Sequence, residues 1–298
     1  NQPDKFSRVL NRITGPAPSL IDGQIHANGE LYLVNPAGVI FGTGAVIEAA
    51  RLHAIAGTIS NNDFSNGLEN FTSLEAQVRN EGIIKAEHIT LAGSSVTNAG
   101  ILNASTGSAV LSASGSMSMT STDGFLSVSI SPASNAPLGA ATDLIGQTLL
   151  NSGVIKAEET HLVGNTITNR GSAESEKVFL SGFSSVSAEN GNFLASEISV
   201  LGSSDNLAGQ DVSSLPDALI TSKGNKISNF KPTGSFGTVS LISSRSTMLS
   251  EAPQHLSKGF VSIGEVDIRV TGGELSLGLT FSPLLNYQSP SLLLATKD

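Results

Sequence analysis

Apolar and polar residues alternate over short stretches of the chain, and Asn-x-Gly motifs interrupt this alternation. The segment "VRNEGIIKA" (Val78–Ala86) shows both features, because an Asn-Glu-Gly motif lies between alternating residues. Alternation over about four to eight residues indicates a strand with one buried face, and Asn and Gly favour turns. The pattern therefore predicts many short strands joined by tight turns, and few helices.

Two long segments of this pattern repeat each other. Asn80–Gly100 and Asn151–Gly171 are identical at 11 of 21 aligned positions, and three further positions differ by Ile/Val or Ser/Thr exchanges. Val46–Asn61 is a weaker third copy, in which Asn61 aligns with Asn98. Within the first copy the Asn-x-Gly motif recurs after 18 residues. This period fits one coil of a β-solenoid, in which each coil buries its inward residues on the next.

The repeated Asn has a predicted structural role in such a solenoid. Equivalent Asn residues on successive coils can stack as a ladder, with each side-chain amide bonded to the next. A β-sandwich with chance similarity is the alternative, and the number of identities disfavours it. The predicted ladder positions are Asn61, Asn80, Asn98, Asn151 and Asn169.

The pattern divides the chain into three predicted regions. Residues 1–75 form the first coils, residues 76–203 the repeat coils, and residues 204–298 a loop excursion, C-terminal coils and an apolar capping tail. Two irregular segments are predicted to leave the coils as excursions. One, residues 131–150, has two prolines and a helix-like run, and the other, residues 204–229, is polar.

Composition and charge exclude several functions. The net charge is −9, which disfavours nucleic acid and anionic membranes as partners. No apolar run reaches the roughly 18 residues that a membrane-spanning helix needs. The chain has no cysteine. A non-nucleic-acid-binding chain without a membrane-spanning segment is therefore expected.

Candidate chemistry is sparse, and we expect no catalytic residue, cofactor or metal. The aspartates are scattered, without an Asp-x-Asp pair of the kind that sugar-cleaving β-helices group on one face. Neither a cysteine nucleophile nor a Gly-x-Ser-x-Gly motif is present. No metal-ligand spacing joins the five histidines, which are His26, His53, His88, His161 and His255.

Five motifs occur in a fixed order along the first part of the chain. They are "NRITG" (Asn11–Gly15), "ANG" (Ala27–Gly29), "NPAGVIFG" (Asn35–Gly42), "ISNNDF" (Ile59–Phe64) and "VRNEGIIKA" (Val78–Ala86). This order resembles the haemagglutination-activity domain of two-partner-secretion exoproteins, the filamentous haemagglutinin type. The resemblance implies a single-stranded right-handed β-helix, a location outside a bacterium or on its surface, and an outer-membrane barrel transporter as export partner.

The resemblance also implies which residues serve secretion and folding. The segment Asn35–Gly38 reads as a turn with Pro at its second position. Ala37 stands where the family has a second Asn. The implied secretion and folding residues are Asn11, Arg12, Gly15, Asn35, Pro36 and Gly38.

The sequence and the resemblance lead to three hypotheses about function. The main hypothesis is a structural subunit that stacks end to end with copies of itself into an extracellular fibre. It rests on the few residues before Asn11, where the family has opening strands and a cap, since an uncapped strand edge pairs readily with another chain. The alternatives are an adhesin passenger that binds host surfaces or glycans, and, more distantly, a β-helix enzyme that degrades polysaccharides.

Overall fold

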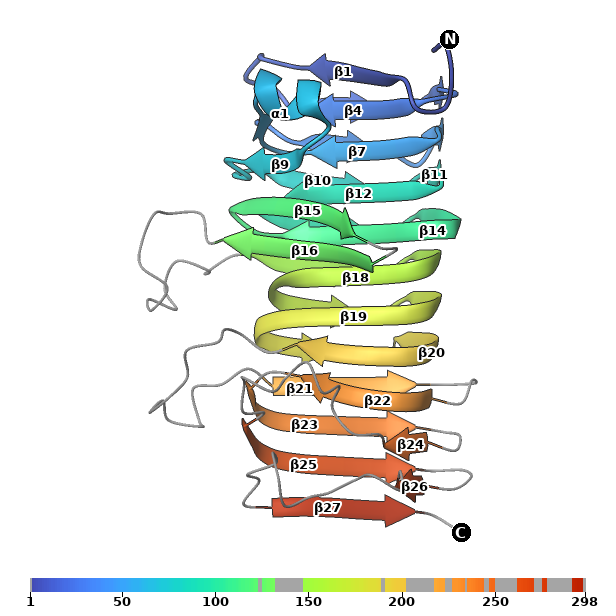
Figure 1. Cartoon of the computed structure of the whole chain (residues 1–298), viewed down its shortest axis with the longest axis vertical. Coiled ribbons are helices and arrows are strands. Elements are labelled where there is room, and N and C mark those ends of the chain that lie inside the picture. The colour runs from blue at the N-terminus through green and yellow to red at the C-terminus, as the bar shows by residue number, and fades with distance from the viewer. Residues whose placement is uncertain are drawn as a thin grey trace. The chain divides into compact units, whose positions relative to one another are not determined.

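Parallel pairing between strands of successive coils organises both parts of the chain (Figure 1). The described residues of this computed structural model fall into two compact units, Asn1–Asn165 and Thr166–Asp298. Each unit is a parallel β-helix, the fold class that the repeat predicts. The structure describes residues 2–122, 125–131, 147–188, 191–201, 217–222, 227–233, 235–243, 247–249, 262–270, 275–277 and 291–296.

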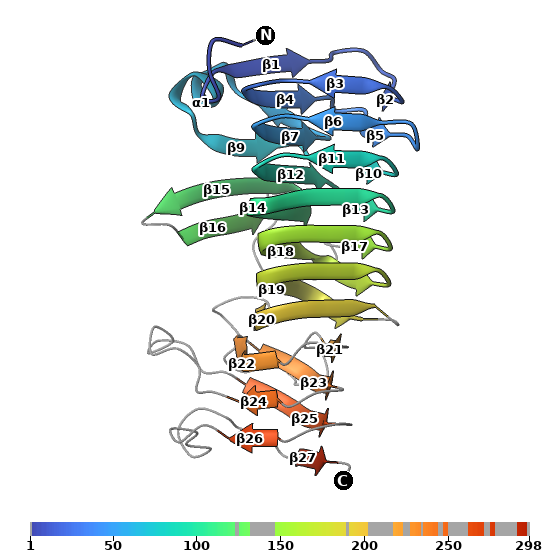
Figure 2. The same ribbon diagram turned by 90° about the vertical axis from the view of Figure 1, so that its right-hand side faces the viewer.

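Each coil of the first unit contributes a strand to three parallel faces (Figure 2). The first face consists of β1 (Arg8–Arg12), β4 (Glu30–Val34), β7 (Arg51–Ile55), β12 (His88–Gly93) and the later part of β14 (Ile101–Ala113). The second consists of β2 (Ser19–Ile21), β5 (Val39–Phe41), β10 (Gln77–Asn80), β13 (Ser95–Asn98) and β17 (Thr148–Asn151). The third consists of β3 (Gln24–His26), β6 (Val46–Glu48), β11 (Ile83–Lys85), the earlier part of β14, and the start of β18 (Val154–Asn169), whose residues 159–163 continue the first face beside the later part of β14.

An asparagine ladder closes the second face of the first unit. Asn80, Asn98 and Asn151 end β10, β13 and β17, and all three are fully buried. The Asn80 amide donates to the Oδ1 of Asn98 at 2.9 Å, and the Asn98 amide donates to the Oδ1 of Asn151 at 2.8 Å. Gly100 follows in the Asn-x-Gly motif, where a Cβ would collide with the carbonyl of Gly82 on the preceding coil. The repeat motif thus fixes both the ladder and the close stacking of the turns.

The predicted ladder position of Asn61 is wrong. The residue paired with Asn80 on the preceding coil is Phe41, and Asn61 instead opens the helix α1 (Asn61–Asn66) with an exposed side chain. The reason is that residues 56–76 leave the coil between β7 and β10. Asn169 lies in the second unit, where its buried side chain donates to the Asn192 carbonyl at 3.0 Å.

Two excursions leave the first unit at the same corner, after a strand of the first face. The first contains β8 (Thr58–Ile59), α1 and β9 (Glu69–Thr72), and the second contains β15 (Ser116–Thr122) and β16 (Phe125–Ser131). β9 pairs antiparallel with β15, so the excursions share one four-stranded sheet with the order β16-β15-β9-β8. We call this the covering sheet. Figure 1 shows β9, β15 and β16 in front of the first face.

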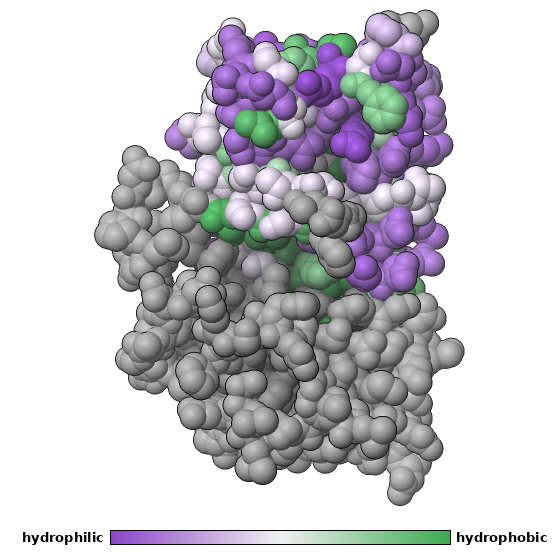
Figure 3. Space-filling model, in the orientation of Figure 1, coloured by the Kyte–Doolittle hydropathy of each residue, from purple (hydrophilic) through white to green (hydrophobic). Residues whose placement is uncertain are grey.

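The covering sheet makes a second hydrophobic core outside the coils. β4 is buried along its whole length, because its inward residues face the coil interior while Tyr32 and Val34 face the covering sheet. Phe71 of β9 and Met117 of β15 pack against them in the same cluster. The alternating pattern predicts one buried side for these strands, and the structure buries both. Figure 3 shows a mostly hydrophilic outer surface over these coils.

The structure agrees only in part with the two predicted excursions. Residues 132–146 of the predicted excursion 131–150 lie outside the described residues, and residues 148–150 belong to β17 rather than to a loop. Of the predicted excursion 204–229, the described residues form a strand and the start of another.

The strands of the second unit are β19 (Ser172–Ser187), β20 (Asn192–Leu201), β21 (Asp217–Ser222), β22 (Ile227–Thr233), β23 (Ser235–Ser243), β24 (Thr247–Leu249), β25 (Ser262–Val270), β26 (Leu275–Leu277) and β27 (Ser291–Thr296). Within the described residues, no helix is long and apolar enough to cross a membrane.

The ladder predicts a specific loss of stability. Asn98→Ala removes the acceptor of Asn80 and the donor to Asn151, so we expect the free energy of unfolding to fall by about 2–3 kcal/mol in urea titrations. Asn103→Ala is the matched control, because Asn103 is partly exposed in β14 and receives only one 3.3 Å bond, from the Ser105 amide. Equal losses for the two variants would contradict a special role for the ladder.

Candidate functional site

Two arginines of β1 hold the first excursion against the first coil. The Arg12 guanidinium donates to the Asn61 side chain at 2.9 Å and to the Ile59 carbonyl at 2.8 Å. Arg8 donates to the Phe64 carbonyl at 2.8 Å. The two residues are four positions apart on a strand and therefore project to the same side. This arginine clamp, Arg8 and Arg12, joins the "NRITG" and "ISNNDF" motifs into one contact.

The helix that the clamp holds is specified locally. Ser60 caps its N-terminus, accepting a hydrogen bond from the Asp63 backbone amide at 2.9 Å and donating to the Asp63 carboxylate at 2.6 Å. Gly67 ends the helix with a φ of 69°, in the left-handed region that favours glycine. The alternating pattern of the sequence predicts few helices, and this helix is not among the elements expected from it. The Ser-x-x-Asp motif followed by Gly was the available signal.

The turn Asn35–Gly38 is built as the sequence predicts. The Gly38 amide donates to the Asn35 carbonyl at 2.9 Å, and the Ala37 amide donates to the Asn35 side chain at 2.9 Å. The buried Asn35 amide in turn donates to the Ala17 carbonyl at 3.0 Å. Gly38 has a φ of 117°, which only glycine adopts readily. Asn35 therefore fixes the turn and the segment before β2 together.

The implied secretion residues fall into separate places. Arg12 belongs to the clamp, whereas Asn35, Pro36 and Gly38 belong to the turn, in which Pro36 is exposed. Asn11 is exposed on β1, and the exposed Gly15 follows that strand, with open space around its Cβ position.

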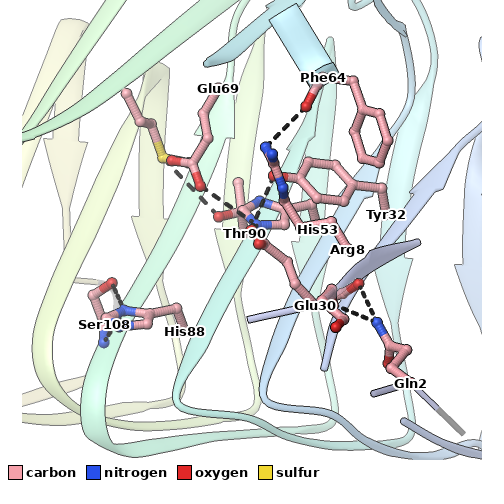
Figure 4. Close-up of polar contacts among 12 residues, drawn as sticks. Gln2, Arg8, Glu30, Tyr32, His53, Phe64, Glu69, His88, Thr90 and Ser108 are labelled. Carbon is pink, nitrogen blue, oxygen red and sulfur yellow. Dashed lines mark hydrogen bonds and ion pairs between the residues drawn. The ribbon is translucent and has the colours of Figure 1, made fainter. Parts of the chain in front are cut away.

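A cluster of polar side chains lies buried between the first face and the covering sheet (Figure 4). The His53 Nε2 is 2.9 Å from Glu30 Oε1 and 3.5 Å from Glu69 Oε1. The Tyr32 hydroxyl donates to the same Glu30 oxygen at 2.9 Å, and its ring stacks on His53 with centroids 4.3 Å apart. Strand pairing sets Tyr32 beside His53, and Glu69 reaches them from β9.

The two carboxylates of this cluster have opposite environments. Burial raises the pKa of Glu30, but the hydrogen bond and charge of His53, with the Tyr32 hydroxyl, outweigh it and hold that pKa below its usual value. Burial dominates at Glu69 and raises its pKa, and the Glu30 charge adds to this effect. Burial and the Glu30 charge raise the pKa of Tyr32, so it remains a neutral donor.

Two cavities flank the cluster. One has a volume of about 350 Å³ and the other about 200 Å³, and Arg51 and Glu69 line both. His53 and His88 line the larger cavity. His88 Nδ1 accepts a hydrogen bond from the Ser108 amide, and burial lowers the His88 pKa.

The cluster brings together a set of possible metal ligands that the spacing of the histidines does not predict. The ligand atoms of Glu30, His53 and Glu69 all lie within 4.8 Å of one another, close enough for one metal ion. Motif spacing misses this set because its members come from two coils and an excursion. Aligning β4 with β7 so that Tyr32 pairs with His53 would have placed Glu30, two residues before Tyr32, close to His53.

The opposite environments predict opposite effects of pH. Ionised Glu69 destabilises the fold, because the stability contributed by its protonated form is lost as pH rises through the raised pKa. Ionised Glu30 stabilises the fold, and this contribution is lost as pH falls through the lowered pKa. We therefore expect Glu69→Gln to raise the free energy of unfolding near pH 7.5 and to change it little near pH 4, in buffer with a chelator.

Glu30→Gln is the matched control for that measurement. It should lower the free energy of unfolding by about 1–3 kcal/mol near pH 7.5 and by less near pH 3. Urea unfolding at several pH values measures both variants. A Glu69→Gln variant that is less stable than the parent at neutral pH would contradict the assignment.

Comparisons with known proteins give the chain's relatives. The family described as "TPS secretion domain" matches residues 1–200. A heme/hemopexin-binding protein of Haemophilus influenzae is 34% identical over 168 residues, which are 52% of this chain and 18% of that protein. Another heme/hemopexin-binding protein of Haemophilus influenzae is 36% identical over 84 residues, 28% of this chain and 9% of that protein. The chain thus spans less than a fifth of the length of these curated relatives.

The fold has a solved counterpart. The crystal structure of the HMW1 secretion domain from Haemophilus influenzae matches with a TM-score of 0.56 at 17% identity, covering 99% of this chain and 87% of that one. This likeness confirms the β-helix fold class. Because the family match extends over more than half of the sequence, the chain belongs to the TPS secretion domain family, and it is part of a secreted or cell-surface exoprotein of the two-partner secretion type.

Proposed function

We propose that this chain directs export of its exoprotein through an outer-membrane transporter and then seeds the folding of the β-helix outside the cell. Family membership implies the transporter as partner. The observation that carries the folding role is the arginine clamp, because it joins two of the family motifs through side chains of β1 and the first excursion. The clamp sets the covering sheet on the first coils, and later coils can then add by parallel pairing.

The turn at Asn35 supports the same role. Its side chain makes the contacts of a turn residue and also bonds Ala17 and Ser19 at the start of β2 on the preceding coil, so it fixes the turn of one coil to the coil before it. Ala37 contributes only its backbone amide to this network. The replacement of the family's Asn by Ala37 therefore leaves the observed turn bonds in place.

The exported product is proposed to bind a ligand and not to catalyse a reaction. The supporting observation is the similarity to two proteins named for binding heme and hemopexin. An adhesin-type passenger that binds a host protein or surface agrees with that similarity better than a fibre subunit does. Surface plasmon resonance tests this proposal. Binding of the purified chain to immobilised hemopexin, with and without heme, is compared with its binding to serum albumin as the control.

End-to-end assembly into a fibre stays a prediction from the sequence. Negative-stain imaging and sedimentation velocity at increasing protein concentration test it. Filaments would support stacking of coils between copies, and a concentration-independent monomer would contradict it.

The clamp yields a prediction for export. Arg12→Ala removes two hydrogen bonds made by a charged donor, which we expect to destabilise the covering sheet by about 1–3 kcal/mol. A loss of this size lowers the amount of folded, secreted protein severalfold. Quantifying the chain in culture medium, with its transporter co-expressed, measures the effect.

Arg79→Ala is the control for this experiment. Arg79 lies on β10 of the second face and pairs with Glu81 of its own coil, away from the "NRITG" and "ISNNDF" motifs. Secretion of Arg12→Ala at the level of Arg79→Ala would overturn the proposed role of the clamp.

A further inference from the structure

We propose that Glu30, His53 and Glu69 form a binding site for a divalent transition-metal ion of the zinc class. The site goes beyond the proposed role in export and does not depend on it. One imidazole nitrogen and two carboxylate oxygens are the donor types that such ions accept, and three protein ligands leave a further coordination position open. All three side chains converge between β4, β7 and β9 (Figure 4).

The distances between the donors suit one small ion. Bonds of about 2.0–2.2 Å in a tetrahedral arrangement separate neighbouring ligand atoms by roughly 3.3–3.6 Å. His53 Nε2 is 3.5 Å from one carboxylate oxygen and 2.9 Å from the other, and all ligand atoms lie within 4.8 Å of one another. Side-chain adjustments of a few tenths of an ångström to about one ångström therefore complete the geometry, without movement of the strands.

The surrounding groups orient the ligands as outer groups of a metal site do. The Tyr32 hydroxyl bonds a Glu30 oxygen, and the Tyr32 ring lies at 16° to the imidazole of His53, which fixes the ring plane. Phe71 contacts the same imidazole with ring centroids 6.0 Å apart. Such orienting partners typically strengthen metal binding about 10- to 100-fold.

Charge balance also favours a cation at this place. Two carboxylates share one imidazole in a buried setting, where an uncompensated negative charge is costly. Arg51 acts on both through its charge. A divalent ion bonded to both oxygens would neutralise the pair directly.

Protein groups alone do not complete the hydrogen bonding of the cluster. The His53 side chain is 2% exposed, and within the described part of the chain its Nδ1 has no hydrogen-bond partner. The nitrogen that faces the two carboxylates is Nε2, so an ion bound there leaves Nδ1 as the protonated nitrogen, and a water in the larger cavity, which His53 lines, would be its partner. The flanking cavities, both lined by Glu69, give an ion a path to the site and room for a bound water.

Zinc titration of the whole, chelator-stripped chain tests the proposal. Isothermal titration calorimetry with Zn²⁺ near pH 7.5 should show one site per chain, and Zn²⁺ should raise the melting temperature. Glu69→Gln should weaken zinc affinity by more than about tenfold, and Tyr32→Phe by about 10- to 100-fold. Parallel titrations with Ca²⁺ should show weaker binding, because one ligand is a nitrogen.

His88→Gln is the matched control, because His88 lines the neighbouring cavity without belonging to the donor set. It should leave zinc affinity unchanged. Circular dichroism of the metal-free variants checks that each is folded, and Tyr32→Phe serves if Glu69→Gln is not. The proposal is overturned if the parent chain does not bind zinc, if Glu69→Gln and Tyr32→Phe bind it as the parent does, if His88→Gln abolishes binding, or if Ca²⁺ binds more tightly.

Discussion

The first unit depends on covering the outward side of its first face. In a solenoid the inward side chains of each strand are buried by the coil itself, and the outward ones normally meet water. Here the outward positions of β4, β7, β12 and β14 carry Tyr32, Ile55, Ala92 and Val110, which are buried. Apolar area of this kind contributes about 25 cal/mol per Å² when it leaves water. The covering sheet, its helix and the arginine clamp all follow from this requirement.

The same requirement creates the polar cluster. Once a sheet lies over the first face, any polar outward residue on that face is trapped away from water and must find partners. His53 and Glu30 bond each other, and Glu69 and Tyr32 join the group, while the His53 Nδ1 has no partner within the described part of the chain. The site is therefore a product of the second core and not of the coil repeat. This explains why it has no counterpart at the other two faces among the described residues.

The parts that sequence reasoning predicts are those that repeat. Asn80, Asn98 and Asn151 recur in one motif, so their parallel register and their ladder follow from the alignment. The covering sheet does not repeat, and the antiparallel contact of Phe71 with Met117 depends on two excursions that no alignment relates. Asn61 was placed wrongly because the alignment ran across residues that leave the coil. Glu30, His53 and Glu69 have irregular spacing, since a different element supplies each of them.

The pairing of β9 with β15 sets an order in time as well as in space. β9 ends at Thr72, and its partner begins only at Ser116, after two further coils of the chain. In the proposed export, a chain that emerges N-terminus first would present β9 with an open edge until β15 follows. During that interval the outward residues of the first coils stay in contact with water, and these coils are held by their parallel strand pairing and by the clamp. Closure of the sheet then buries these outward residues and completes the second core.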